Sequence, residues 1–161
     1  MLSFQELYES YAPDVYRFSF WLTGNGPDAE DITSETFVRA WVKKNTIRTE
    51  TLKAYLFTIA RNVFLEQRRR STREVALEDV QGGPAPGPET AVQSQLELDE
   101  IRRVLRTYLE CDRTAFILRV QHELPYAEIA RVLGLSLSSA KVKVHRVRKK
   151  LLTVRLHREV S

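Results

Sequence analysis

The sequence predicts an all-α protein made of two small helical domains that are joined by a flexible linker. Three observations lead to this prediction. Apolar residues recur every three or four positions through most of the chain, which is the period of an amphipathic helix. No stretch alternates apolar and polar residues as a half-buried strand does. Residues 82–88, GGPAPGP, cannot form regular structure and interrupt the helical pattern.

The linker divides the chain into three predicted segments. Residues 1–73 form an N-terminal domain, residues 74–88 an acidic Gly/Pro-rich linker, and residues 89–161 a C-terminal helix-turn-helix domain. Each flanking segment is small, so each has to bury its core with about three or four helices.

The charge of the chain is distributed in blocks. The formal net charge is −3 over residues 1–45, +5 over 46–73, −7 over 74–100 and +9 over 101–161. Two basic blocks on either side of an acidic one indicate two surfaces for a polyanion such as nucleic acid. The acidic block between them would avoid the polyanion and hold the two surfaces apart. Disorder of this segment explains its acidic composition equally well.

The first helix is expected to begin after Ser3, which with Glu6 fits a capping box, and to run toward residue 22. Pro13 lies inside this run and predicts either a kink or a break. Residues 23–27, TGNGP, form a turn. The expected inward positions of this helix are Leu7, Tyr8, Tyr11, Val15, Phe18 and Leu22.

The second helix is expected over residues 27–44. Pro27 suits the first helical position, and acidic residues in the first turn suit the positive end of the helix dipole. The expected inward stripe is Ile32, Phe37, Val38 and Trp41. A polar and acidic surface remains, and in isolation it is most simply a solvated face; its residues are Asp28, Asp31, Ser34 and Glu35.

The third helix is expected from Thr49 or Thr51, as the cap, to about residue 70. Its buried stripe is Leu52, Leu56, Ile59, Val63 and Phe64. Basic residues alternate with Tyr55, Phe57 and Phe64, and this pattern could grip unstacked single-stranded bases. Each aromatic taken alone is more simply a core residue.

The fourth and fifth helices open the C-terminal domain. The fourth is expected over residues 89–109, with inner positions Val92, Leu96, Ile101, Val104, Leu105 and Tyr108. Asp112 is expected to cap the fifth over residues 113–123, with Phe116, Ile117 and Val120 inward.

Residues 124–152 are typical of a helix-turn-helix. Ile129, Val132 and Leu133 repeat at helical spacing, Gly134 permits a sharp turn, and Ser136 is a good N-cap for the helix that follows. Residues 137–152 contain six lysines and arginines and no acidic residue. A short helix, a glycine turn and a cationic helix are what a protein needs to place a helix in the DNA major groove.

Several function classes are not expected. The sequence has no apolar run long enough to span a membrane and no signal peptide, so a cytoplasmic location is the simplest expectation. The single Cys111 excludes an internal disulfide and a cysteine-cluster zinc site, and His122, His145 and His157 are not at metal-ligand spacings. With no Gly-rich phosphate loop and no nucleophile–base pair, we expect no enzyme and no cofactor.

Three stretches in order resemble the sigma-70 family of bacterial RNA polymerase sigma factors, specifically the extracytoplasmic-function (ECF) group. Residues 28–41, DAEDITSETFVRAW, resemble the polymerase-binding helix of this family. Residues 52–62, LKAYLFTIARN, resemble its promoter-melting helix, and residues 126–148 resemble its C-terminal helix-turn-helix. The resemblance covers nearly the whole chain, including the linker.

The resemblance implies partners for the N-terminal domain. The second helix would dock on the clamp helices of the polymerase beta-prime subunit, with Asp28, Asp31, Ser34, Glu35 and Phe37 as candidate contacts. Ser34 departs from the glutamine that is usual in the family. The third helix and the loop before it would read and melt the minus-ten element, with Asn62 as the base contact. The candidate phosphate contacts are Lys53, Arg61, Arg68, Arg69 and Arg70.

The resemblance also implies roles for the C-terminal domain, which would read the minus-thirty-five element. The candidate DNA contacts are Ser138, Ser139, Lys141, Val142, Lys143, His145, Arg146 and Lys149. Ser138 and Val142 depart from the residues common there, so the family's promoter sequence does not transfer. Further implied partners are the polymerase beta flap and an anti-sigma factor, and no small-molecule substrate is implied. The alternative is a helix-turn-helix regulator that binds duplex DNA without core polymerase.

Overall fold

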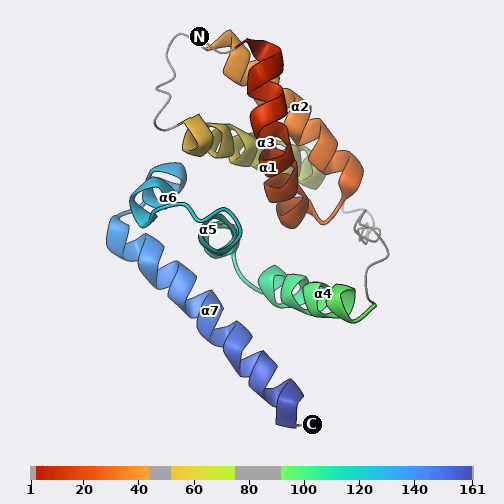
Figure 1. Cartoon of the computed structure of the whole chain (residues 1–161), viewed down its shortest axis with the longest axis vertical. Coiled ribbons are helices and arrows are strands. Elements are labelled where there is room, and N and C mark those ends of the chain that lie inside the picture. The colour runs from red at the N-terminus through yellow and green to blue at the C-terminus, as the bar shows by residue number, and fades with distance from the viewer. Residues whose placement is uncertain (1–2, 44–51, 75–91, 161) are drawn as a thin grey trace. The chain divides into compact units, whose positions relative to one another are not determined.

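The structure is a computed structural model that describes residues 3–43, 52–74 and 92–160, with side chains for 3–43, 52–71 and 98–154. These residues form seven helices and no strand (Figure 1). The chain divides into two compact units, residues 1–86 (unit 1) and 87–161 (unit 2). No helix in the described ranges is long and apolar enough to cross a membrane. The predicted all-α class is confirmed.

Unit 1 is a three-helix assembly. Its helices are α1 (Phe4–Thr23), α2 (Gly26–Val42) and α3 (Leu52–Glu74), and each of them packs on the other two. Phe18 and Phe57 join α1 to α3 in the centre, with ring centroids 4.9 Å apart. The loop before the third helix and the two alternative caps of that helix, Thr49 and Thr51, lie outside the described residues.

The ends of α1 follow from local hydrogen bonds. The Ser3 hydroxyl accepts from the Glu6 N–H at 3.1 Å and the Glu6 carboxylate accepts from the Ser3 N–H at 3.2 Å, which confirms the predicted capping box. The helix continues through Pro13 without a break. It ends at Gly24, whose φ of 68° is a left-handed conformation that favours glycine. Of the predicted inward positions, Tyr8 lies exposed.

The prediction that Val38 points inward is wrong. Its side chain is 54% exposed, whereas Thr33 and Thr36 are buried with Ile32 and Phe37. The two threonines can be buried because their hydroxyls donate to carbonyls one turn earlier, at 2.7 and 2.6 Å. Small and satisfied polar residues therefore complete the inward side of α2, and Val38 lies outside it.

Unit 2 is built from α4 (Val92–Arg106), α5 (Glu110–Val120), α6 (Tyr126–Leu133) and α7 (Leu137–Val160). Helices α5, α6 and α7 pack on one another, and α4 packs on α7. The core contains residues of every helix, among them Leu105, Ile117, Ile129, Val144 and Val147.

Two predictions for the fifth helix are wrong. Helix α5 begins at Glu110 rather than after Asp112, and its N-cap Leu109 makes no side-chain cap, so Asp112 lies within the first turn. Val120 is exposed near the end of the helix. The chain leaves α5 through Glu123 at φ 54°, and the Leu124 N–H donates to the Leu118 carbonyl at 3.1 Å, a closure that the sequence did not signal with glycine.

The helix-turn-helix is confirmed. Ile129, Val132 and Leu133 are buried, and Gly134 closes α6 at φ 66°. Ser136 caps α7, because its hydroxyl accepts from the Ser139 N–H at 3.1 Å. This turn sets the angle at which α7 leaves α6, so it determines which side of α7 faces away from the core.

Candidate protein and nucleic-acid interfaces

An exposed acidic face runs along α2. Asp28, Asp31 and Glu35 are exposed at spacings of three and four residues, so they share one side of the helix, with exposed Ser34 beside them. Among the described residues only Glu35 of these three acids has an ion-pair partner, Arg39. The carboxylates of Asp28 and Asp31, which have no ion-pair partner in the described part of the chain, can therefore interact with a cationic partner.

Arg39 connects this face to α3. Its Nε donates to the Glu35 carboxylate at 2.9 Å, and its two terminal nitrogens donate to both oxygens of Glu66 at 3.2 and 2.7 Å. The guanidinium holds the pKa of Glu66 below its usual range, chiefly through these hydrogen bonds, and the two carboxylates raise the pKa of Arg39. The bidentate pair fixes α2 against α3 at this point.

The prediction that Phe37 lies at the surface as a polymerase contact is wrong. Its side chain is fully buried, and its ring packs edge-on against Tyr8 with centroids 5.1 Å apart. The exposed apolar residues on the acidic side are instead Val38 and Val42. Their spacing from Asp31 and Glu35, seven residues in each case, was the signal in the sequence that would have identified them.

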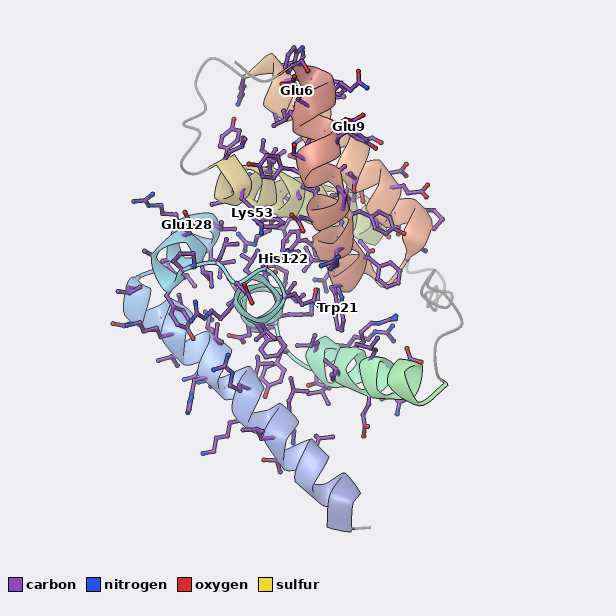
Figure 2. All side chains as sticks on the ribbon, in the orientation of Figure 1. Glu6, Glu9, Trp21, Lys53, His122 and Glu128 are labelled. Carbon is purple, nitrogen blue, oxygen red and sulfur yellow. The ribbon has the colours of Figure 1, made fainter. Side chains whose placement is uncertain are left out.

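The predicted minus-ten residues do not share one side of α3. Asn62 is exposed, whereas Lys53 lies nine residues earlier, about half a turn out of phase, and approaches Asp14 of α1 at 3.9 Å. Arg61 is half-buried on a neighbouring position. The structure therefore separates Lys53 from Asn62, the predicted base contact (Lys53 is labelled in Figure 2).

The three arginines at residues 68–70 are exposed. Arg68 lies over the Phe64 ring at 5.9 Å, and the Arg69 Nε donates to the Leu65 carbonyl at 3.4 Å. Arg69 and Arg70 also help to lower the pKa of Glu66. The cluster presents a positive end of α3 that can meet phosphates.

Of the three aromatic residues on α3 that were candidates for stacking on bases, only Tyr55 is partly exposed. Phe57 and Phe64 are buried, as the simpler core interpretation predicted, and so they are excluded from stacking on bases in this conformation. Tyr55 is half-buried and lies seven residues before Asn62, on the same side of α3. Tyr55 and Asn62 are therefore the stacking and amide groups that the structure brings onto one surface.

One side of α7 faces away from the core. Ala140, Val144 and Val147 are buried, which fixes the inward side. Five of the predicted minus-thirty-five residues are exposed around the opposite side: Ser138, Lys141, Val142, His145 and Lys149. Arg146 is exposed at the edge of this surface, where its carbonyl accepts from the Tyr108 hydroxyl at 3.4 Å.

Two predicted contacts on α7 have structural partners. Lys143 points toward α5, where its ammonium lies 3.0 Å from the Asp112 carboxylate; its side chain is 23% exposed and that of Asp112 is 14% exposed. The DNA contact of Lys143 stays a prediction, and in this conformation its ammonium is paired with Asp112. The Ser139 hydroxyl is half-buried and accepts from Ser136 at 3.0 Å, within the N-cap.

A cluster that the sequence reasoning missed lies beside the recognition surface. The Arg119 guanidinium covers the Tyr126 ring at 4.5 Å, and the Lys141 ammonium lies 6.0 Å from the same ring. Arg119 also donates to the Leu124 carbonyl at 3.1 Å, which ties α5 to the start of α6. Since the sequence of α5 is that of an ordinary amphipathic helix, no local pattern signalled that Arg119 and Lys141 would both lie near the Tyr126 ring.

Comparisons with known proteins identify the family of the chain. Residues 7–74 match the family described as Sigma-70 region 2, and residues 98–151 match Sigma-70, region 4. The chain is 32% identical over 154 residues to the ECF RNA polymerase sigma factor SigM of Bacillus subtilis, covering 93% of each protein. It is 33% identical over 156 residues to SigE of Mycolicibacterium smegmatis, covering 94% of this chain and 61% of that one.

A solved structure supports the same assignment. The sigma factor RpoE of Bartonella quintana, crystallised with the anti-sigma factor NepR, is similar with a TM-score of 0.75 and 28% identity. The match covers 92% of this chain and 93% of that one. With an exposed acidic helix in unit 1 and a cationic helix-turn-helix in unit 2, the chain belongs to the ECF group of the sigma-70 family, whose members bind core RNA polymerase and direct promoter-specific transcription initiation.

Proposed function

We propose that the two units divide promoter recognition between them at the surfaces described above. Unit 1 binds the beta-prime clamp helices of core polymerase through Asp28, Asp31, Ser34 and Glu35, and it opens the minus-ten element with α3. Unit 2 binds the minus-thirty-five element with α7 and meets the beta flap. The observation that supports this division is the sign of the exposed charge, which is negative on α2 and positive on α7.

The minus-ten role is assigned to α3. Extruding a base from the duplex costs a few kcal/mol, so the protein has to offer stacking and hydrogen bonds in return. Tyr55 offers a partly exposed ring and Asn62 an exposed amide on the same side of the helix. Arg61 and the arginines at 68–70 neutralise phosphates and position the strand without reading it.

The minus-thirty-five role is assigned to the exposed side of α7. Lys141, His145 and Arg146 can donate to guanine acceptors in the major groove, and each good bidentate pair contributes about 1–3 kcal/mol of discrimination. Val142 offers an apolar contact that suits a thymine methyl group. Lys149 lies one turn beyond His145, where phosphate contacts position the helix.

Three further properties are part of the proposal. The factor acts in the cytoplasm, where core polymerase and promoter DNA are found. It performs no catalysis of its own, in keeping with a family of transcription initiation factors. An anti-sigma factor holds it inactive, as the structural relative from Bartonella quintana was crystallised with one.

The test is reconstitution with purified core polymerase and the promoters found by mapping transcript starts after overexpression. The wild-type chain should bind core and support initiation. Asp31→Arg with Glu35→Arg should lose core binding while helix content and duplex binding by unit 2 remain, since both residues are exposed. A chain that binds duplex DNA specifically, yet neither binds core nor starts transcripts, would establish the alternative of a helix-turn-helix regulator.

A further inference from the structure

Two cations share the Tyr126 ring in unit 2. Tyr126 is the first residue of α6, and its side chain is half-buried. The Arg119 guanidinium of α5 lies 4.5 Å from the centroid of the ring, and the Lys141 ammonium of α7 lies 6.0 Å from it. Because α5, α6 and α7 pack on one another, a single ring at the start of α6 can contact side chains of both other helices (Figure 1).

The protein holds these two cations differently. Arg119 is half-buried and also donates to the Leu124 carbonyl at 3.1 Å, so its guanidinium is fixed by two contacts. Lys141 is exposed, and its distance from the ring is at the outer limit of a cation–π contact, which is about 6 Å. The ring therefore attracts the Lys141 ammonium without enclosing it, and the ammonium stays accessible to DNA.

Charge further restricts where the Lys141 ammonium can lie. The Arg119 guanidinium has the same sign and lies closer to the ring, so it repels the ammonium from its own side of the ring. Attraction by Tyr126 and repulsion by Arg119 together favour a narrow set of directions for an otherwise flexible surface side chain.

Such a restriction matters for a lysine that reads DNA. A lysine ammonium is a point charge on a flexible four-carbon chain, whereas arginine presents a rigid planar fork. Ordering a flexible side chain at an interface costs free energy, and preorganisation reduces that cost. Lys141 lies one turn after the first residue of α7, Leu137, and residues near the start of a recognition helix contact base edges.

We propose that Tyr126 is a positioning residue for the minus-thirty-five element, and that with Arg119 it directs the Lys141 ammonium toward one guanine in the major groove. This inference rests on the proposed role of α7, and it adds residues of α5 and α6 to the reading of sequence. A contact between the Tyr126 hydroxyl and a phosphate would act differently, because phosphate contacts position the protein without reading bases.

The experiment measures the affinity of the full chain, by fluorescence anisotropy, for a minus-thirty-five duplex and for duplexes in which one base pair at a time is changed. Lys141→Met first identifies the base pair that Lys141 discriminates. Tyr126→Leu should reduce the discrimination at this base pair about two- to fivefold, as expected for loss of an exposed cation–π contact, and leave it intact at the other base pairs. In the Lys141→Met background, Tyr126→Leu should alter the discrimination no further.

Two controls separate positioning from a structural role. Tyr126→Phe keeps the ring and removes the hydroxyl, so it should discriminate as the wild type does. Tyr16→Leu, at a half-buried tyrosine of α1 that is assigned no DNA contact, is the matched control and should also match the wild type. Discrimination is a ratio of two affinities, and a partly unfolded variant loses apparent affinity for every duplex alike, so the ratio reports on positioning alone.

The outcomes that overturn the proposal differ from a failure of the proposed function. If Tyr126→Leu discriminates like the wild type at the base pair of Lys141, the ring does not position the ammonium. If Tyr126→Phe and Tyr126→Leu weaken binding to every duplex equally, the hydroxyl contacts a phosphate instead. If Lys141→Met alters no discrimination while the wild type still prefers the minus-thirty-five duplex, the proposal fails and the role of α7 stands. If the wild type prefers no duplex, the proposed function fails as well.

Discussion

The pair formed by Lys143 and Asp112 offers the sharpest test of the structure against the sequence, because the sequence placed Lys143 on DNA. An exposed ion pair contributes about 0–1 kcal/mol, and breaking a fully buried one costs about 3–5 kcal/mol. With side chains 23% and 14% exposed and a separation of 3.0 Å, this pair lies between those limits. We expect Lys143→Met to destabilise unit 2 by about 1–2 kcal/mol, since it leaves the Asp112 carboxylate without its partner.

The assay combines stability with DNA binding. For a unit of this size, a loss of about 1–2 kcal/mol lowers the melting temperature by roughly 5–10 °C, which calorimetry of the full chain detects. The double variant Asp112→Asn with Lys143→Met should recover most of the loss, because no unpaired charge remains. The salt dependence of binding to a minus-thirty-five duplex should match the wild type.

The opposite result would refute this reasoning. If Lys143 contacts a phosphate, Lys143→Met lowers the slope of log affinity against log salt by about 0.9 and leaves the melting temperature unaltered. Lys149→Met, at the exposed position on α7 that is assigned to a phosphate contact, is the reference for that behaviour.

Three further predictions follow from particular residues. Gly134→Ala should destabilise the chain by about 1 kcal/mol in urea unfolding, because its φ of 66° strains any Cβ although no atom lies within 4 Å of the added carbon. Arg39 lowers the pKa of Glu66 below 4.5, so the stabilisation that this ion pair contributes is present above that pH and is lost as the pH falls. The unfolding free energy of the wild type should therefore drop more steeply below about pH 4.5 than that of Glu66→Gln. Asn62→Ala should reduce permanganate-detected melting and minus-ten discrimination, whereas Lys53→Ala, on the opposite side of α3, should leave the discrimination intact; equal effects of the two would contradict the assignment.

Much of the fold was predictable because it depends on local signals. The capping box of Ser3 and Glu6, the turn at Gly134 and the cap at Ser136 each act within a few residues, and the structure confirms all three. Helical periodicity likewise identified Ile129 and Val132 as residues on the buried side of a helix. These features need no knowledge of what packs against them.

The wrong predictions concern side chains at the edge of a helix's apolar stripe, which can be either buried or exposed. Val38 and Val120 are apolar residues at the edge of a helical stripe, and only the position of the neighbouring helix decides whether they are covered. Phe37 adjoined the acidic residues in sequence, but α1 covers it. The periodicity of the sequence shows on which side of a helix a residue lies. It does not show which side a neighbouring helix covers.

The sequence by itself determined the helices, their caps, the alternating charge and the resemblance to sigma factors, because these are properties of adjacent residues. Only the tertiary structure decided which of the charged residues face outward. It directed Lys143 to Asp112, joined Arg39 to Glu66, and left Lys141, Val142 and His145 exposed together. The physical reason is that a cation near a carboxylate of another helix forms an ion pair, and that proximity depends on how α5, α6 and α7 pack.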